Sequence, residues 1–227
     1  MSFSVIIPVY SEESTINRQL EHVASIFQGH CFEIIVIDGH QEDSTLKVVE
    51  DNSIIKVSSA RGRGIQLQKG LEAASKDICL FLHADTKLPQ DAPAEINRIL
   101  GEYYAGAFDL RIDDWHPAFR FIEQTAALRS RLTKIPYGDQ AVFTRRGTAL
   151  AIGFEPIPIM EDVTFMKELK GKGFSVGFSD RCVYTSSRRW RKEGILRCTL
   201  RNWKLAVLYN YGVHPSKLAE EYSPNVD

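Results

Sequence analysis

The stretch L-F-L-H-A-D-T at residues 80–86 begins with three apolar residues and continues with His83, Ala84 and Asp85. A short apolar run of this kind is typical of a strand that is covered on both faces of a sheet. The imidazole and the carboxylate that follow it bind protons or metal ions, and an apolar core offers them no partner. The stretch therefore predicts a buried strand that delivers two reactive side chains to one edge of a sheet.

Similar runs recur along the first hundred residues and alternate with helix-like segments. The predicted strands are Phe3–Val9, Phe32–Ile37, Ile54–Val57 and Ile78–Leu82, and the predicted helices are Glu13–Phe27, Asp43–Glu50 and Arg63–Ser75. We expect Ser11 or Glu12 to start the first helix, and Asp43, Ser44 and Thr45 to supply acceptors for the amides of the second. Strand and helix in alternation indicate right-handed crossovers and a parallel α/β sheet.

The second half of the sequence is less regular. It contains predicted strands at Gly106–Ile112 and Ala141–Thr144, predicted helices at Ala118–Leu132, Met160–Leu169 and Ile195–Tyr211, and a polar tail after Pro215. The 227 residues are 44% hydrophobic and 25% charged, which suits one domain around one sizeable core.

Charge and cysteine usage exclude several classes of protein. With 28 Lys and Arg against 29 Asp and Glu, nothing indicates a nucleic-acid partner. The four cysteines lack C-x-x-C spacing, which argues against a disulfide framework or a zinc knuckle and favours a reducing cytoplasm. The N-terminus is a poor signal peptide, and no apolar run approaches the ~20 residues needed to span a bilayer.

Ligands of open parallel sheets bind beyond the carboxyl ends of the strands. The residues that follow the four predicted strands include Tyr10 and Glu12, Asp38 and His40, Arg61 to Gly64, and His83 with Asp85. One Asp at a strand end is usually a helix cap, and one His is usually a core or surface residue. Carboxylates and arginines together instead suit a phosphorylated ligand bridged by a divalent cation.

Three familiar phosphate-site patterns are absent. After Gly62 and Gly64, the third glycine of a dinucleotide fingerprint would fall at Leu67. The sequence contains no G-x-x-x-x-G-K-[ST] motif, and His40 occupies the position of the second Asp in a phosphatase pattern. A Rossmann NAD site, a P-loop and that phosphatase site are therefore not expected.

Seven motifs occur in the order seen in family-two glycosyltransferases. They are S-V-I-I-P-V-Y-S-E-E (4–13), V-I-D-G-H-Q-E-D-S-T (36–45), R-G-R-G-I-Q (61–66), L-H-A-D-T (82–86), Y-G-D-Q (137–140), M-E-D-V-T-F (160–165) and S-R-R-W (187–190). The chain resembles this family, and especially the subgroup with L-H-A-D-T, P-Y-G-D-Q and R-R-W that is sometimes labelled arsenosugar-biosynthesis-type glycosyltransferases. The resemblance implies a single GT-A domain over 1–227: a Rossmann-like, mostly parallel nucleotide-binding half (1–100) and a mixed acceptor half with the C-terminal helix (101–227).

The resemblance also implies a metal and donor site. Asp85 matches the last aspartate of the family's D-x-D motif, which binds Mn²⁺ or Mg²⁺, while His83 replaces the first. Because Mn²⁺ tolerates imidazole better than Mg²⁺ does, we expect a preference for Mn²⁺; alternatively, His83 only hydrogen-bonds the ribose or a neighbouring strand. The residues expected around the base and ribose of the donor are Pro8, Tyr10, Glu12, Asp38 and Arg61.

The same comparison implies catalytic roles. In M-E-D, Asp162 resembles the family's general base and Glu161 its support, although both would also stabilise a helix N-terminus. Asp139 matches a loop near the donor sugar and the acceptor. Arg188, Arg189 and Trp190 resemble an element in which arginine meets pyrophosphate and Trp stacks on a sugar.

Two further expectations concern the C-terminal helix and the reaction. Basic and apolar residues alternate from Arg188 to Tyr209, so the helix could rest on anionic lipid or a partner, or could pack its apolar face on the domain. We expect a hexosyltransferase-type enzyme that moves a sugar, with inversion and with a metal, from a UDP-linked donor to a small-molecule or lipid acceptor. It would be cytoplasmic, with peripheral contact at the inner membrane face; the oligomeric state is left open.

Two alternatives remain open at this point. A nucleotidyltransferase would use a related scaffold, but Tyr10, Ser11 and Glu12 stand where its glycine-rich loop should follow the first strand. A non-catalytic regulator that binds nucleotide sugars would retain only the cleft, whereas Asp85 and Asp162 are both present.

Overall fold

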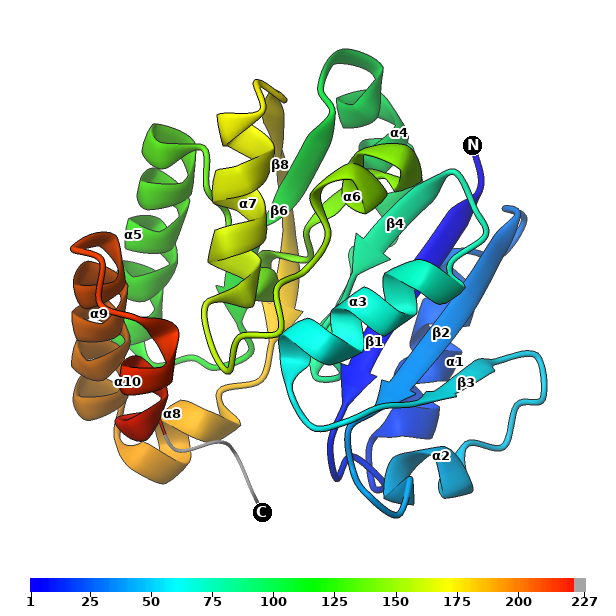
Figure 1. Cartoon of the computed structure of the whole chain (residues 1–227), viewed down its shortest axis with the longest axis horizontal. Helices are drawn as coiled ribbons and strands as arrows, with labels where there is room; N and C mark the ends of the chain where they lie inside the picture. Colours follow the sequence, from blue (N-terminus) through cyan, green and yellow to red (C-terminus); the bar gives the residue numbers. More distant parts are fainter. Residues whose placement is uncertain (223–227) are drawn as a thin grey trace.

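One eight-stranded sheet runs through the computed structural model, which describes residues 1–222 (Figure 1). Its strand order is β3-β2-β1-β4-β7-β6-β8-β5. The strands are β1 (Phe3–Val9), β2 (Phe32–Asp38), β3 (Ile55–Ser58), β4 (Ile78–Phe81), β5 (Thr86–Lys87), β6 (Ala105–Ile112), β7 (Phe143–Arg145) and β8 (Val176–Thr185). The first four are parallel, β7 runs antiparallel between β4 and β6, β8 is parallel to β6, and β5 is antiparallel to β8. The predicted α/β class, with a parallel half and a mixed half, is confirmed.

Helices cover both faces of the sheet. One face packs against α1 (Ile16–Ile26), α2 (Ser44–Val48) and α4 (Ala92–Glu102), and the other against α3 (Arg63–Ala73), α6 (Arg146–Ile152) and α7 (Glu161–Gly171). Along β1, Val5 and Ile7 belong to the first core and Ile6 to the second, so every position is buried. This explains why the strand is an unbroken apolar run, in which each buried Val or Ile contributes about 1.5–3 kcal/mol.

The remaining helices lie at the side of the mixed half. They are α5 (Pro117–Thr133), the 3-10 turn η1 (Gly138–Gln140), α8 (Arg188–Glu193), α9 (Ile195–Asn210) and α10 (Pro215–Glu220). In Figure 1, α9 and α10 stand beside α5, away from the parallel strands. A small separate core of Ile159, Leu205 and Leu218 holds α9 and α10.

Several elements differ from the sequence-based expectations. The helices α4 and α6 and the strand β8 were not predicted. Pro215–Glu220 form a short helix with Leu218 buried rather than the start of a polar tail, and the rest of that predicted tail, residues 223–227, lies outside the described residues. In β8 the register shifts, so that Phe178 pairs with Ala107 but Cys182 pairs with Asp109. This bulge breaks the alternation of apolar and polar residues that would have revealed the strand.

The helix starts also differ. The first helix begins at Ile16, and neither Ser11 nor Glu12 caps it; Asp43, before α2, is left-handed and makes no capping hydrogen bond. The acceptor for the amides of α2 is Asp38, seven residues before Thr45: its Oδ2 accepts hydrogen bonds from the N–H groups of Thr45 at 2.8 Å and Leu46 at 3.3 Å. A cap supplied from the preceding strand cannot be read from local helix signals.

Candidate active site

Strand direction brings the motif residues to one edge of the sheet. The carboxyl ends of β1, β2, β3 and β4 lie there because these strands are parallel. The carboxyl end of β8 lies there as well, because β8 is parallel to β6, and β7 runs antiparallel to both β6 and β4. Because β7 runs the opposite way, the turn η1 that precedes it lies at the same edge. The start of α7 joins them, since Oδ2 of Asp162 accepts a hydrogen bond from the N–H of Gly138.

Planar side chains gather beyond β1 and β3. The guanidinium carbon of Arg61 lies 4.6 Å from the ring centroid of Tyr10, and the His40 ring lies 5.4 Å from that centroid. Flat cationic and aromatic groups of this kind suit stacking on a nucleobase. Pro8, by contrast, is buried within β1, where it pairs with Ile37, so it does not belong to this group of planar side chains.

Asp38 is fully buried. Besides the two bonds to α2, its Oδ1 accepts a hydrogen bond from the N–H of His40 at 2.8 Å. The carboxylate thus holds the loop between β2 and α2 through three backbone donors. Its expected contact with the base stays a prediction, and the structure gives it a structural role that the sequence reading did not include.

Glu12, Asp85 and Arg188 form an acidic and basic group at the middle of the edge. Nη2 of Arg188 lies 3.3 Å from Oε1 of Glu12, whose Oε2 accepts a hydrogen bond from Oγ1 of Thr15 at 2.7 Å. Burial raises the pKa of Asp85, the negative charge of Glu12 raises it further, and Arg188 opposes both. Two converging carboxylates favour a bound cation, which would relieve their repulsion.

These donors fit a metal that is shared with a ligand. Among residues 1–222, no three His, Cys, Asp or Glu side chains form a closed metal site. Mg²⁺ and Mn²⁺ at diphosphate sites need only one or two protein carboxylates, because phosphate and water oxygens supply the rest. Asp85, with Glu12 beside it, meets that requirement.

His83 faces a different set of neighbours. Its Nε2 lies 3.4 Å from Nη1 of Arg63, and burial together with the Arg63 charge lowers the pKa of His83 to about 3. The imidazole is therefore neutral, but the guanidinium beside Nε2 opposes a second cation at that atom. Metal binding by His83 and its alternative, a hydrogen bond to the ribose or to a neighbouring strand, both stay predictions; the contact that the structure gives is with Arg63 of α3.

Arg63 is the site residue that sequence reasoning missed. Its Nε donates a hydrogen bond to Oε1 of Glu161, which is 1% exposed, and Oε2 of Glu161 has no hydrogen-bond partner within the described residues. Burial raises the pKa of Glu161, and Arg63 counters that effect. The available signal was the second arginine of R-G-R-G, since a buried glutamate needs a cation.

Asp162 and Asp139 lie beside this pair. Oδ1 of Asp162 accepts a hydrogen bond from the N–H of Val163 at 2.7 Å, so both oxygens of Asp162 are oriented by backbone donors. Burial raises the pKa of Asp139 to about 6; Arg129 opposes this shift and Asp162 adds to it. The carboxylates of Asp139 and Asp162 thus lie close together, and the charge of Arg63 acts both on Asp139 and on Asp85.

The three residues of R-R-W are separated by the fold. Arg188 faces Glu12 and the site, whereas Arg189 bonds Oε1 of Glu193 at 3.0 Å and the hydroxyl of Tyr222. The Trp190 ring packs edge-on against Phe119, with 5.9 Å between centroids. Arg189 and Trp190 therefore belong to the packing of the C-terminal helices, and only Arg188 lies where a diphosphate contact was expected.

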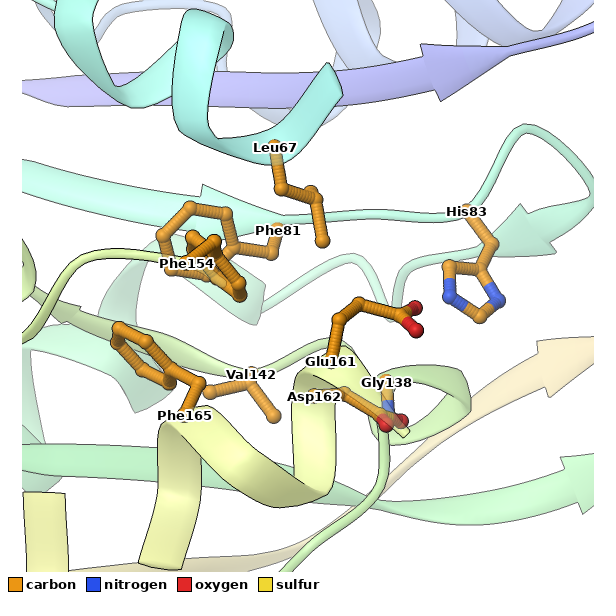
Figure 2. A pocket seen from close by; sticks show the side chains of 9 residues that line it. All are labelled: Leu67, Phe81, His83, Gly138, Val142, Phe154, Glu161, Asp162 and Phe165. Atoms are coloured by element: carbon orange, nitrogen blue, oxygen red, sulfur yellow. The ribbon is translucent and has the colours of Figure 1, made fainter. Parts of the chain in front are cut away.

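An apolar pocket adjoins the charged groups. Figure 2 shows Leu67, Phe81, Val142, Phe154 and Phe165 on one side of it, and His83, Gly138, Glu161 and Asp162 on the other. The carboxylate of Glu161 and the imidazole of His83 point into the same space. Stacking of Phe154 on Phe165, with 4.4 Å between centroids, gives the apolar side a rigid wall.

Comparisons with known proteins agree with this architecture. A mannosyltransferase from Pyrobaculum calidifontis, solved with GDP-Man and Mn²⁺, has a TM-score of 0.62 at 19% identity, covering 80% of this chain and 56% of that one. Glucosyl-3-phosphoglycerate synthase from Mycobacterium tuberculosis, solved with Mn²⁺, UDP and glucosyl-3-phosphoglycerate, has a TM-score of 0.59 at 18% identity, covering 82% and 70%. At these identities the likeness establishes the fold alone, which is the GT-A fold.

Sequence comparison then identifies the family. The pattern described as Glycosyl transferase family 2 matches residues 4–153, and the chain belongs to this family. The dolichol-phosphate mannosyltransferase of Pyrococcus furiosus is 27% identical over 97 residues, which are 40% of this chain and 28% of that protein. The chain thus matches less than a third of that relative's length. The expected fold, family and enzyme class are confirmed, and the finer subgroup stays a prediction.

Proposed function

We propose that this protein transfers a sugar, with inversion and with a divalent metal, from a UDP-linked donor to a small-molecule or lipid acceptor. The observation that supports the proposal is that Arg63 lies near both acidic groups: near Asp85, which also has Glu12 and Arg188 around it, and near Asp162. One side of the site suits a diphosphate, and the other suits the hydroxyl that attacks the sugar. Membership of the arsenosugar-type subgroup is part of the proposal and rests on the motifs alone.

Two structurally similar proteins support a nucleotide-linked donor. The structurally similar synthase carries UDP and Mn²⁺, and the similar mannosyltransferase carries GDP-Man and Mn²⁺. In this chain Tyr10 and Arg61 would stack on the base, and Arg188 would meet the diphosphate. Asp85, supported by Glu12, would hold the cation, with Nδ1 of His83 as a second ligand. When bound, the metal supplies positive charge to the leaving diphosphate.

Asp162 is the proposed general base. The acceptor hydroxyl loses its proton to an Asp162 oxygen while its own oxygen bonds the anomeric carbon. The bond from that carbon to the phosphate oxygen breaks on the opposite face, so the configuration inverts. The backbone donors Gly138 and Val163 fix the orientation of the carboxylate, and the Arg63 and Arg188 charges stabilise the departing nucleotide.

For the acceptor we propose only a class of compound, and for the location only a compartment of the cell. A lipid acceptor agrees with the name of the dolichol-phosphate relative, and a small molecule with that of the phosphoglycerate synthase. All four cysteines are free, which suits the reducing cytoplasm. A peripheral position at the inner face of the membrane would accompany a lipid acceptor.

The test begins with donor binding and hydrolysis. A panel of UDP- and GDP-sugars is screened for thermal stabilisation in the presence of Mn²⁺, because a ligand that binds only the folded state raises the melting temperature. We expect a UDP-sugar to stabilise most, and to be hydrolysed slowly to sugar and UDP without an acceptor. A nucleotidyltransferase would release other products, and a regulator would release none.

Variants then separate the roles. Asp162→Asn should lower transfer or hydrolysis by about 10²-fold or more with donor affinity nearly unchanged, whereas Asp85→Asn should abolish Mn²⁺-dependent donor binding. Asp180→Asn, at a side chain that is 98% exposed, serves as the control and should change neither. Full activity of Asp162→Asn would refute the assignment of the base.

A further inference from the structure

The helices α5 and α9 expose a row of large apolar side chains, which we call the α5–α9 face. Its members are Phe121, Leu128 and Leu132 on α5, and Leu196, Leu200, Trp203, Val207 and Tyr211 on and just after α9. Each is between 43% and 86% exposed. Single exposed apolar residues are common, but a gathered set of this size marks an interaction surface.

Spacing places these residues in two adjoining stripes. Leu196, Leu200, Trp203 and Val207 are separated by four, three and four positions, which puts them on one side of a helix. Phe121, Leu128 and Leu132 form an equivalent stripe on α5. The rings of Phe121 and Trp203 meet with 6.3 Å between centroids, so the two stripes form one surface.

The domain does not use this surface for its own packing. The residues that α9 buries are Cys198, Thr199 and Leu205, on the opposite side of the helix. Leu205 and Leu208 pack on the core shared with α10, as one of the two expectations for this helix holds, whereas Leu196, Leu200 and Trp203 do not. The broad apolar side of α9 faces outward.

The segment that forms α8 and α9 is rich in basic residues, several of which pair with carboxylates. Residues 188–210 contain seven Arg and Lys and one Glu, whereas the whole chain has a net charge of −1. Arg197 and Lys204 are exposed on α9 itself, next to the apolar stripe, and Nζ of Lys204 also pairs with Oε2 of Glu221 at 2.7 Å. Apolar side chains flanked by cations on a helix that lies flat are typical of binding to anionic lipid.

Charge distinguishes between the two simplest occupants. A second copy of this chain docked by two-fold symmetry would bring the same basic residues opposite one another, which is unfavourable. An anionic bilayer offers acyl chains to the Leu and Trp side chains and negative headgroups to Arg197 and Lys204. None of the helices within residues 1–222 is long and apolar enough to cross a membrane, so the helix would lie on it.

We infer that the α5–α9 face binds the surface of an anionic bilayer. The inference deepens the proposed peripheral position and, for its role in lipid glycosylation, rests on the proposed function. The helix α8 leads from Arg188 in the site to Gly194, where α9 starts, so membrane binding would hold the site close to the lipid headgroups (Figure 1).

Vesicle sedimentation tests the inference without any donor, acceptor or metal. The full chain is mixed with vesicles of phosphatidylglycerol and phosphatidylcholine, or of phosphatidylcholine alone. We expect binding to the first, reduced by added salt, and at least about tenfold weaker binding to the second. This experiment does not measure turnover. Its failure would therefore contradict membrane binding only, and would leave the transferase proposal to its own test.

Two variants and a control complete the experiment. Leu200→Glu with Trp203→Glu should lower vesicle binding at least about tenfold, and Arg197→Ser with Lys204→Ser should remove the preference for anionic lipid. Leu150 is a similarly exposed Leu on α6, and the variant Leu150→Glu should bind the vesicles as tightly as the unchanged protein does. Circular dichroism checks that each variant is folded.

Two results would overturn the inference. One is vesicle binding that is absent or indifferent to the Leu200 and Trp203 changes. The other is a dimer in sedimentation equilibrium that these changes dissociate, since the face would then be an interface between two copies of the chain.

Discussion

Nε of Arg63 donates a hydrogen bond to Oε1 of Glu161, a carboxylate that is 1% exposed and lies 98 residues further along the chain. The bond ties the start of α3 to the start of α7, and so connects the loop after β3 with the helix that carries Asp162. Glu161 raises the pKa of Arg63, which keeps the guanidinium charged at every accessible pH. The pair therefore has both a structural and an electrostatic role in the site.

Breaking this pair should be costly. Arg63→Met leaves a buried carboxylate without its cation and should lower the free energy of unfolding by about 3–5 kcal/mol, measured by urea denaturation. Adding Glu161→Gln should restore much of the loss, since no buried charge remains. Arg98→Met, which breaks the exposed pair with Glu95, is the control and should cost under about 1 kcal/mol. Equal costs for Arg63→Met and Arg98→Met would show that burial of Glu161 does not matter.

Metal preference should depend on residue 83. We expect stronger donor binding with Mn²⁺ than with Mg²⁺ in the unchanged protein, and a several-fold smaller ratio in His83→Asp, which restores two carboxylates to the motif. Titration calorimetry with a UDP-sugar and each metal measures the ratio, with His40→Asn as a control that should not alter it. Equal binding with both metals in the unchanged protein would mean that His83 contacts only Arg63 and the ligand.

The raised pKa of Asp139 should appear in the pH dependence of stability. A carboxyl whose pKa is about 6 in the folded state and 3.8 in the unfolded state destabilises the fold when it is ionised, so the cost is present above pH 6 and vanishes below pH 4. Asp139→Asn should therefore raise the free energy of unfolding on the order of 1–3 kcal/mol at pH 8 and leave it unchanged at pH 3.5. Denaturation at a series of pH values measures this difference, and the exposed Asp180→Asn should show no such trend. If Asp139→Asn changed the free energy of unfolding by the same amount at pH 8 and at pH 3.5, the effect would not come from ionisation of Asp139.

Gly64 should be required for close packing. A Cβ added there would lie 2.2 Å from the carbonyl oxygen of Glu155 and 3.3 Å from Cβ of Glu161. Gly64→Ala should therefore lower the free energy of unfolding by about 1–3 kcal/mol or more. Gly101 also lies in a helix but has open space around it, so Gly101→Ala should instead stabilise by about 0.5–1 kcal/mol. The melting temperature should fall in Gly64→Ala and rise in Gly101→Ala. A change of the same sign in both variants would argue against the close contact between Gly64 and Glu155.

The sequence by itself determined the parallel half of the sheet and the edge at which the site lies. Strands such as β1 and β4 are covered on both faces, so their apolar runs are unbroken and easily recognised. Parallel strands must end at one edge, which is why the contact between Tyr10 and Arg61 could be expected from the sequence. The bulged strand β8 was not predicted, because Asp180 and Arg181, two adjacent polar residues, interrupt the alternation of apolar and polar residues.

Only the tertiary structure decided which of the motif residues meet. The buried Asp38 caps α2. Arg188 contacts Glu12 in the site, whereas Arg189 contacts Glu193. Arg63 pairs with Glu161. It also decided that the apolar stripe of α9 faces outward beside that of α5. Sequence patterns report neighbours within a few residues along a helix or strand, whereas each of these outcomes depends on how elements far apart in the chain pack together.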